Sequence, residues 1–237
     1  MKNKLFDICQ KNDISLSSEQ LEQFETFYDY MLEMNQVMNL TSITDEDEVV
    51  LKHFFDSMSL INYYEVKNGS RVIDVGTGAG FPGIPLAILL PNVHFTLMDS
   101  LNKRILFLKD VVKKCGLNNV ECIHSRAEEL AKDMNYREQF DLCVSRAVAN
   151  LSVLLEYCIP FIKKGGSFIS YKSVASDDEL AESKNAQNAT QSDYNSQPQN
   201  YQPTLQTAYS EPQTQPYSNP MQDVVNQSQS VVHTYEA

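Results

Sequence analysis

Residues 71–83 read RVIDVGTGAGFPG, and this stretch decides the fold. A short β-branched run is followed by glycines at positions 76, 78 and 80, and then by an apolar segment that opens with Pro82. A strand, a glycine turn and a helix in this order place a nucleotide-like ligand at the carboxyl end of a parallel strand. Glycine suits such a turn because the backbone often needs positive φ angles and because a Cβ would keep the ligand away.

The glycine pattern by itself leaves the ligand open. The G-x-G-x-x-G at 78–83 also fits the dinucleotide fingerprint of NAD-binding proteins, and Asp99 follows Gly80 by about the spacing expected of a ribose-binding acid. Two details favour S-adenosylmethionine. Asp74 ends the strand directly before Val75 and the glycine turn, and Pro82 removes a backbone N–H where a pyrophosphate would want donors. Besides binding of S-adenosylmethionine or NAD, the third interpretation is that the glycine turn is purely structural and binds no ligand.

Beyond this stretch, short strands alternate with helices. We expect strands at 72–75, 94–98, 120–123, 140–144 and 167–172, helices at about 82–90, 103–115 and 151–162, and a turn at 163–166. This alternation predicts βαβ units and a parallel sheet, and therefore an α/β fold.

Residues 1–66 are predicted to form a helical cap that precedes the sheet. Ser17 and Gln20 have the spacing of a capping box at the start of one helix, and a second helix runs from about residue 44 to residue 64. His53 and Asp56 lie near the centre of the second helix, where we interpret them as a surface hydrogen bond rather than a site. Residues 67–173 would then form the ligand-binding domain.

Candidate functional residues gather at the ends of successive strands, where open α/β sheets bind ligands. They are Asp74, Gly76, Asp99, residues 126–128, Ser145, Arg146 and Lys172.

Composition limits the possible partners. The formal net charge is -12, so non-specific binding to nucleic acid should be weak and any RNA contact must come from a local basic patch. The 5 cysteines include no C-x-x-C pair, which favours small buried side chains in a reducing cytosol over metal or disulfide roles. No stretch predicts a signal peptide or a membrane span.

Six segments carry a resemblance to a known family. They are NLT at 39–41, HFFDS at 53–57, DVGTGAGFPGIPLA at 74–87, DSLNKR at 99–104, SRAEE at 125–129 and SRAVA at 145–149. Over about residues 1–173 the chain resembles the bacterial glucose-inhibited division protein B family, the small-subunit rRNA methyltransferase G group. The resemblance implies a class I, Rossmann-like methyltransferase sheet. It also implies transfer of a methyl group from S-adenosylmethionine to N7 of a guanine in 16S rRNA, by a cytoplasmic monomer that has the small ribosomal subunit as its partner.

Carried over residue by residue, the resemblance implies cofactor contacts at Gly76, Phe81, Ala127, Glu128 and Arg146. To these we add Gly78 and Gly80, where the backbone can approach the ligand, and Asp99, which suits the ribose hydroxyls. Arg146 would either fix a carboxylate or reach the N7/O6 edge of guanine, and the sequence leaves both roles open.

Methyl transfer to guanine N7 needs no general base, because N7 carries an accessible lone pair and no proton. We therefore expect no catalytic acid or base and no metal, only in-line alignment with water excluded. The guanine must be presented in a loop or flipped out of its helix. Candidate RNA-binding residues are Lys103, Arg104, Arg126 and Lys172.

Residues 174–237 differ from the family. They are rich in Gln, Asn, Ser, Thr, Pro and Tyr, and this composition predicts a disordered tail. The family continues here with a helix and two strands that complete the sheet, whereas Val231 and Val232 are too short a run to indicate a strand. We therefore expect the last two strands to be missing and strand 167–172 to be an exposed edge. Two alternative functions remain: a catalytically impaired RNA- or protein-binding module with a low-complexity interaction tail, and an NAD-dependent oxidoreductase.

Overall fold

The computed structural model describes residues 1–146, 150–172, 205–207 and 231–236. The helical elements are α1 (Lys2–Lys11), α2 (Ser18–Met38), α3 (Glu46–Val49), the π-helix η1 (Val50–Phe55), α4 (Asp56–Met58), η2 (Ser59–Asn62), α5 (Gly83–Leu89), α6 (Asn102–Lys114), α7 (Ala127–Leu130), α8 (Leu151–Cys158) and η3 (Ile159–Phe161). The strands are β1 (Arg71–Val75), β2 (His94–Asp99), β3 (Val120–His124), β4 (Phe140–Ser145), β5 (Ile162–Lys172), β6 (Leu205–Thr207) and β7 (Val231–Glu236).

The strands form one sheet in the order β3-β2-β1-β4-β5-β7-β6. Strands β1 to β5 are parallel, with Val72 of β1 paired to Phe95 of β2 and to Leu142 of β4. Their carboxyl ends therefore meet at one edge of the sheet. The strand order reverses between β1 and β4, which is the point where open α/β sheets bind ligands.

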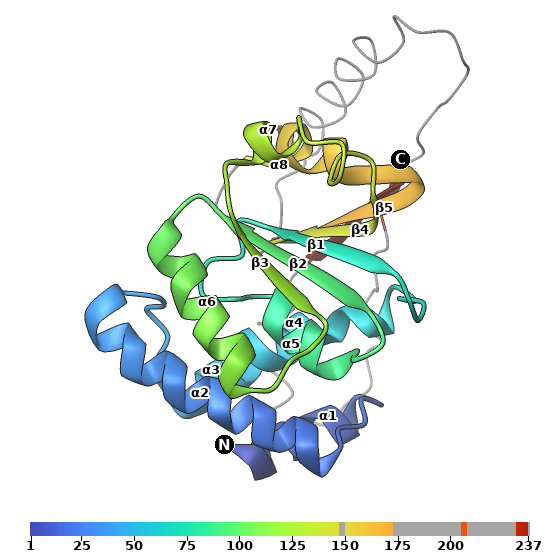
Figure 1. Ribbon diagram of the computed structural model, residues 1–237. Helices are drawn as coiled ribbons and strands as arrows, with labels where there is room; N and C mark the ends of the chain where they lie inside the picture. The colour runs from blue at the N-terminus through green and yellow to red at the C-terminus, as the bar shows by residue number, and fades with distance from the viewer. Residues whose placement is uncertain (147–149, 173–204, 208–230, 237) are drawn as a thin grey trace, which may run out of the picture.

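Helices cover both faces of the sheet (Figure 1). One buried cluster joins the cap, α5 and α6 to one face, and it includes Val72 and Leu97. A second cluster joins α7 and α8 to the opposite face, and it includes Ile73 and Met98. Neighbouring residues of a strand thus enter different cores, as expected for a parallel sheet that is buried on both sides.

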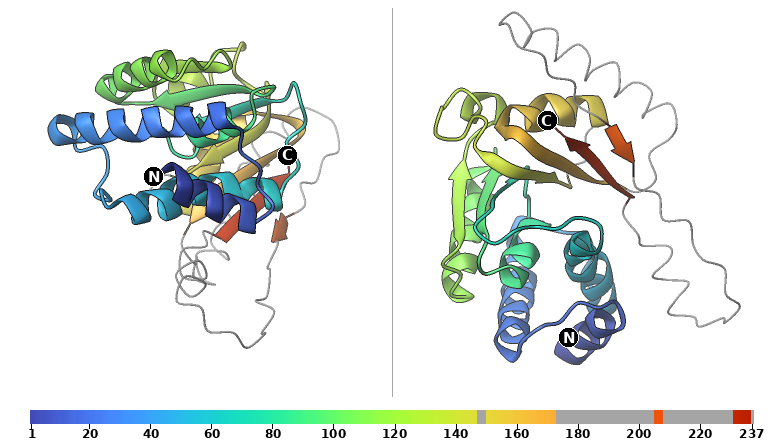
Figure 2. Two further views of the ribbon diagram at one scale, coloured as in Figure 1. Left: turned by 90° about the horizontal axis from the view of Figure 1, so that it is seen from below. Right: turned by 90° about the vertical axis from the view of Figure 1, so that its right-hand side faces the viewer.

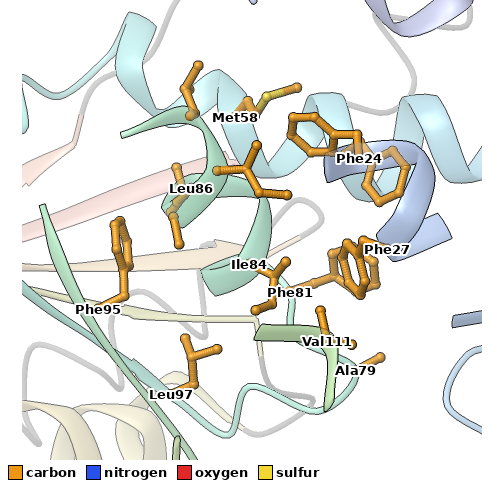
Figure 3. Close-up of a cluster of buried hydrophobic side chains, with 14 of the residues drawn as sticks. Phe24, Phe27, Met58, Ala79, Phe81, Ile84, Leu86, Phe95, Leu97 and Val111 are labelled. Carbon is orange, nitrogen blue, oxygen red and sulfur yellow. The ribbon is translucent and has the colours of Figure 1, made fainter. Parts of the chain in front are cut away.

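The cap packs through aromatic side chains against the glycine turn (Figure 3). Phe27 of α2 lies 5.2 Å from Phe81, and Phe54 of η1 lies 6.0 Å from it, measured between ring centroids. A fully buried side chain of this size contributes about 1.5–3 kcal/mol. The ion pair of Lys2 with Glu22 is exposed, and exposed pairs add little to stability, so apolar packing holds the cap on the sheet.

The predicted start of α2 is confirmed in detail. The Ser17 hydroxyl accepts from the Gln20 N–H at 3.2 Å, and the Gln20 side-chain oxygen accepts from the Ser17 N–H at 2.9 Å. The second predicted helix is a run of four short elements from α3 to η2, with the π-helix in the middle. Helix α1 is present although no prediction was made for residues 2–11.

The prediction that the last two strands are missing is wrong. β7 pairs antiparallel with β5, from Ser167 opposite Glu236 to Lys172 opposite Val231, and β6 pairs antiparallel with β7. In Figure 2, β7 lies beside β5, and β6 lies on the outer side of β7. The physical reason is that the edge of β5 offers unpaired N–H and C=O groups, and residues 231–236, VVHTYE, are largely β-branched or aromatic. The rest of the predicted disordered tail, at 173–204, 208–230 and 237, lies outside the described residues.

The predicted turn at 163–166 lies within β5 instead. Ile162 pairs with Phe140, but the next pair is Ser167 with Leu142, so the segment between them forms a bulge. Gly165 has a φ angle of 78°, which accommodates the extra residues without ending the strand.

Candidate active site

The glycine turn leaves β1 at the centre of the ligand-binding edge. The N–H groups of Gly76 and Thr77 donate to the Met98 carbonyl at 3.0 and 3.1 Å, which ties the start of the turn to the end of β2. Gly76, Gly78 and Gly80 have φ angles of 73°, 61° and 97°. These lie in the left-handed region that L side chains rarely adopt, so the sequence folds this way because glycine occupies all three positions.

The second and third glycines are needed for different reasons. A Cβ at Gly78 would meet nothing closer than the Gly76 carbonyl at 3.9 Å, so the backbone there faces open space. A Cβ at Gly80 would lie 2.8 Å from Ile84 and 2.9 Å from Leu108, which are side chains of α5 and α6. Gly80 therefore allows helix packing, whereas Gly78 leaves room for a ligand.

Asp99 connects the turn to the start of α6. Its Oδ2 accepts from the Gly78 N–H at 3.0 Å and from Arg104 Nη1 at 3.3 Å, and its Oδ1 accepts from the Leu101 N–H at 2.8 Å. The residue is 3% exposed. A carboxylate has about four acceptor positions, so these contacts leave about one for a ligand hydroxyl.

A cavity of about 380 Å³ opens at the carboxyl ends of β1, β2 and β3. This volume lies within the roughly 300–1,000 Å³ typical of small-molecule sites. The cavity is lined by Val75, Gly76, Met98, Asp99, Ser100, Leu101, Ser125, Arg126, Ala127, Glu128, Leu154 and Tyr157. The wall thus combines an exposed glycine backbone and two acids with apolar side chains from α8.

The residues present fit the predicted cofactor. Asp99 keeps acceptor capacity for ribose hydroxyls, and Ala127 and Glu128 at the start of α7 offer a small apolar surface and an acid beside it. Gly76 and Gly78 leave the backbone open between this wall and Phe81. An adenosine would occupy the β2–β3 end, and the amino-acid portion would extend along the turn.

Asp74 is a fully buried acid beneath the turn. Its Oδ2 accepts from the Gly83 N–H at 2.9 Å. Burial raises the pKa of Asp74 to about 7, against the lowering effects of the Thr77 hydroxyl, the Gly83 N–H and Arg146. The acid fixes the first residue of α5 and does not line the cavity.

Arg146 lies at the other end of the glycine turn. Its Nη1 donates to the Lys52 carbonyl and to Asp56 Oδ2, both at 3.1 Å, and its guanidinium carbon lies 5.0 Å from the centre of the Phe81 ring. The preceding residue, Ser145, donates its hydroxyl to the Val75 carbonyl at 2.8 Å. Arg146 and Phe81 are therefore next to the turn but outside the cavity lining.

The interpretation of His53 and Asp56 as a surface hydrogen bond is wrong. His53 stacks on Phe81 with ring centroids 4.5 Å apart, and its Nε2 lies 2.9 Å from the Thr41 hydroxyl. Arg146 Nη2 donates to its Nδ1 at 3.3 Å, which requires a neutral ring. Burial, helped by Arg146, lowers the pKa of His53 to about 4. His53, Asp56 and the Lys52 carbonyl, from the consecutive elements η1 and α4, thus converge on one guanidinium.

The candidate RNA-binding residues differ in their surroundings. Lys103 is exposed in the first turn of α6, and Arg126 is exposed at the cavity. Arg104 turns inward to Asp99, with its side chain 34% exposed. The side chain of Lys172 lies outside the described residues.

Several lining residues were missed by the sequence analysis: Ser100, Leu101, Ser125, Leu154 and Tyr157. Ser100, Leu101 and Ser125 directly follow strand ends, which is the one signal that could have found them. Leu154 and Tyr157 come from α8, and nothing in their own pattern separates a lining position from a core position.

The described residues contain neither a membrane-spanning helix nor a metal-binding cluster. No helix among them is long and apolar enough to cross a membrane. No group of three or more His, Cys, Asp or Glu side chains in those same residues could hold a metal ion.

Comparisons with known proteins agree with this geometry. The family model described as rRNA small subunit methyltransferase G (GidB) matches residues 20–205. A ribosomal RNA small subunit methyltransferase G from Lachnoclostridium phytofermentans is 53% identical over 173 residues, covering 73% of this chain and 72% of the relative. The protein of that name from Thermoanaerobacter sp. is 50% identical over 190 residues, covering 78% and 79%.

A solved structure shares the fold at much lower identity. The crystal structure of a proposed O-methyltransferase from Klebsiella pneumoniae has a TM-score of 0.50 and 14% identity, and it covers 89% of this chain and 90% of its own. The fold is therefore that of the class I methyltransferases, as predicted. With the family match extending over most of its length, the chain belongs to the rRNA small subunit methyltransferase G (GidB) family.

Proposed function

We propose that this chain transfers the methyl group of S-adenosylmethionine to N7 of a guanine in 16S rRNA. The observation that carries the proposal is the cavity at the ends of β1, β2 and β3, which an open glycine backbone and Asp99 line in a chain of this family. The small ribosomal subunit, or a particle that precedes it, is the partner. Since ribosomes assemble there, the cytoplasm is the location, and the chain acts as a monomer.

Each wall of the cavity has a role in holding the cofactor. Asp99 accepts hydrogen bonds from the ribose, and its position is fixed by the Gly78 and Leu101 N–H groups. Ala127 and Glu128 contact the adenine, and Gly76 lets the backbone approach the sulfur end. Arg146 holds the carboxylate at the far end of the turn, beside Phe81. Lys103 and Arg126 are the exposed cations that contact the RNA.

The cofactor supplies an electrophilic methyl group on a sulfonium sulfur. With the cofactor bound, the bond from the methyl carbon to guanine N7 would form as the methyl–sulfur bond breaks and S-adenosylhomocysteine leaves. Because N7 would attack with a lone pair and carries no proton, the protein has no proton to remove. The work of this chain is to align N7, the methyl carbon and the sulfur, and to exclude water. Arg146 acts on the carboxylate and not on guanine, because a donor bound to N7 would occupy the lone pair that must attack.

Calorimetric titration of the full chain with S-adenosylmethionine, with NAD as the control ligand, tests the first half of the proposal. We expect saturable binding of S-adenosylmethionine alone. The second half is tested by methyl transfer to 16S rRNA, supplied both as naked RNA and as small-subunit particles, with the methylated position found by N7-specific strand scission.

The remaining outcomes separate the alternative functions. Binding of NAD alone would support the oxidoreductase. Binding of S-adenosylmethionine without any methyl transfer to either RNA form would support the impaired binding module. The domain boundaries at residues 66 and 173 stay a prediction, which limited proteolysis of the full chain can test.

A further inference from the structure

We propose that Asp56 and His53 of the cap are positioning residues for Arg146, and that they hold its guanidinium in the orientation that binds the carboxylate of the cofactor. The inference deepens the proposed function and rests on it. It assigns a role in cofactor binding to the amino-terminal cap, which does not otherwise contribute to the cavity wall.

Several contacts fix the guanidinium of Arg146. Nη1 donates to the Lys52 carbonyl and to Asp56 Oδ2, and Nη2 donates to His53 Nδ1. The Phe81 ring lies below the plane of the group, with the guanidinium carbon 5.0 Å from its centre. Three acceptors on one helical segment together with an aromatic face leave the guanidinium little freedom to rotate.

These contacts leave some N–H donors of Arg146 for a ligand. An arginine has five N–H donors, and the three contacts leave Nε–H and one Nη2–H without a partner among the described residues. Nε and Nη2 lie on the same edge of the planar group. Paired donors of this kind match the two oxygens of a carboxylate.

The Nε/Nη2 edge of Arg146 lies at one end of the glycine turn, and the cavity lies at the other. The cavity reaches the turn at Gly76, and the turn ends at Phe81, on which Arg146 lies. Ser145 anchors the backbone before Arg146 to the carbonyl of Val75, a residue of the cavity wall. A ligand that starts in the cavity and follows the open backbone of Gly78 therefore extends toward Arg146.

The charges of Asp56 and Arg146 form a largely buried ion pair. Asp56 is 6% exposed and the Arg146 side chain is 18% exposed, so the ion pair is largely withdrawn from water. Such a pair adds little to stability compared with an apolar pair of the same shape, but it restricts geometry. The stacked ring of His53 contributes a neutral acceptor that does not compete for the positive charge. Both features suit a positioning role.

The test compares two ligands in calorimetric titrations of the full chain. S-adenosylmethionine carries the carboxylate, whereas 5′-methylthioadenosine keeps the adenosine and the sulfur and lacks the amino-acid portion. In the Asp56→Asn variant we expect the dissociation constant for S-adenosylmethionine to rise by about tenfold, the size expected when a charge-assisted contact is disturbed. The constant for 5′-methylthioadenosine should change by less than about twofold.

Asp47→Asn is the matched control, because Asp47 lies in the same cap but pairs with Lys4 at the surface. It should change neither constant. Equal losses for both ligands in Asp56→Asn would show a merely structural role, and no loss for either would show that Arg146 needs no such support. Both results overturn the inference.

A second variant keeps the inference testable if Asp56→Asn does not fold, which its circular dichroism would show. His53→Leu removes the acceptor for Nη2 and keeps an apolar side chain on Phe81. The same selective loss for S-adenosylmethionine is expected, and a parallel loss for both ligands counts against the inference. If the unmodified chain binds neither ligand, the proposed function fails instead, so the two failures are distinguishable.

Discussion

The two ends of the glycine turn use the same amino acid for opposite purposes. At the cavity end, Gly76 and Gly78 leave the backbone uncovered, and a Cβ at Gly78 would meet open space. At the cap end, Gly80 is enclosed by Ile84 and Leu108, and Phe81 is covered by His53. One motif therefore contains a ligand-binding half and a packing half.

This difference separates affinity from stability. Changes at the cavity end remove ligand contacts while the surrounding elements keep their packing. Changes at the cap end disturb a core that joins the cap to α5 and α6. Variants at the two ends of the turn therefore test this contrast between affinity and stability.

The largest expected effect is at the packed end. Gly80→Ala places a Cβ 2.8 Å from Ile84 and 2.9 Å from Leu108, at a φ angle of 97°. We expect the free energy of unfolding to fall by about 3 kcal/mol, from overpacking together with backbone strain. Chemical denaturation of the full chain measures this.

Gly78→Ala is the paired variant because it has a φ angle of 61° but open space around the Cβ. Its loss should be about 1 kcal/mol, from backbone strain alone. Equal losses in the two variants would mean that the turn has no separate packing half.

The next effect is a pH dependence that originates at the cap end. The pKa of His53 is lowered to about 4 from its ordinary value of 6.5, chiefly by burial. Between these values the unfolded chain binds the proton more readily than the folded chain. The contribution of His53 is therefore complete above pH 6.5 and is lost as the pH falls toward 4, by about 2 kcal/mol once partial screening by solvent is allowed for.

The His53→Gln variant isolates this contribution, since Asp74 acts in the opposite direction. The pKa of Asp74 is raised to about 7, so its contribution is present at low pH and is lost as the pH rises. Denaturation curves at several pH values should show the variant gaining stability relative to the unmodified chain as the pH falls. A constant difference across that range would argue against a neutral, buried His53.

A smaller effect is expected at the cavity end. Asp99→Asn removes the charge that faces the ribose, while the amide oxygen can still accept one backbone N–H. We expect the affinity for S-adenosylmethionine to fall by about tenfold. Asp110→Asn is the control, because Asp110 is an exposed acid on the same helix that accepts from the Tyr30 hydroxyl at 3.2 Å and does not line the cavity. Titration of both variants measures the contrast.

The sheet could be predicted as far as local pattern decides structure. The five parallel strands follow from short apolar runs that alternate with helices, and the start of α2 follows from the spacing of Ser17 and Gln20. The pairing of β7 was missed because a strand of six residues gains its stability from the edge of β5, and nothing local to residues 231–236 records that partner.

The residues of the site also divide into those that local pattern predicts and those that depend on a distant partner. Gly76, Asp99 and Ala127 were predicted from strand ends, and the structure places all three on one cavity. The environment of His53 and Asp56 was missed because their partner, Arg146, is ninety residues from Asp56 in the sequence. A helical period shows that two side chains are neighbours on a helix, but it does not show which distant residue covers them.

The smallest effect is expected outside both ends of the turn, at the exposed Lys103 of α6. Lys103→Ala should weaken binding to small-subunit RNA by about threefold and reduce the slope of log affinity against log salt by about 1, as expected for one phosphate contact. Affinity for S-adenosylmethionine should not change, because Lys103 is not part of the cavity wall. Lys132→Ala is the matched control. Lys132 is a surface cation that follows α7 in the sequence and pairs with Glu129. If both variants reduce the salt slope equally, the RNA contacts the protein through its general charge, and the cavity rim has no special part in recognition.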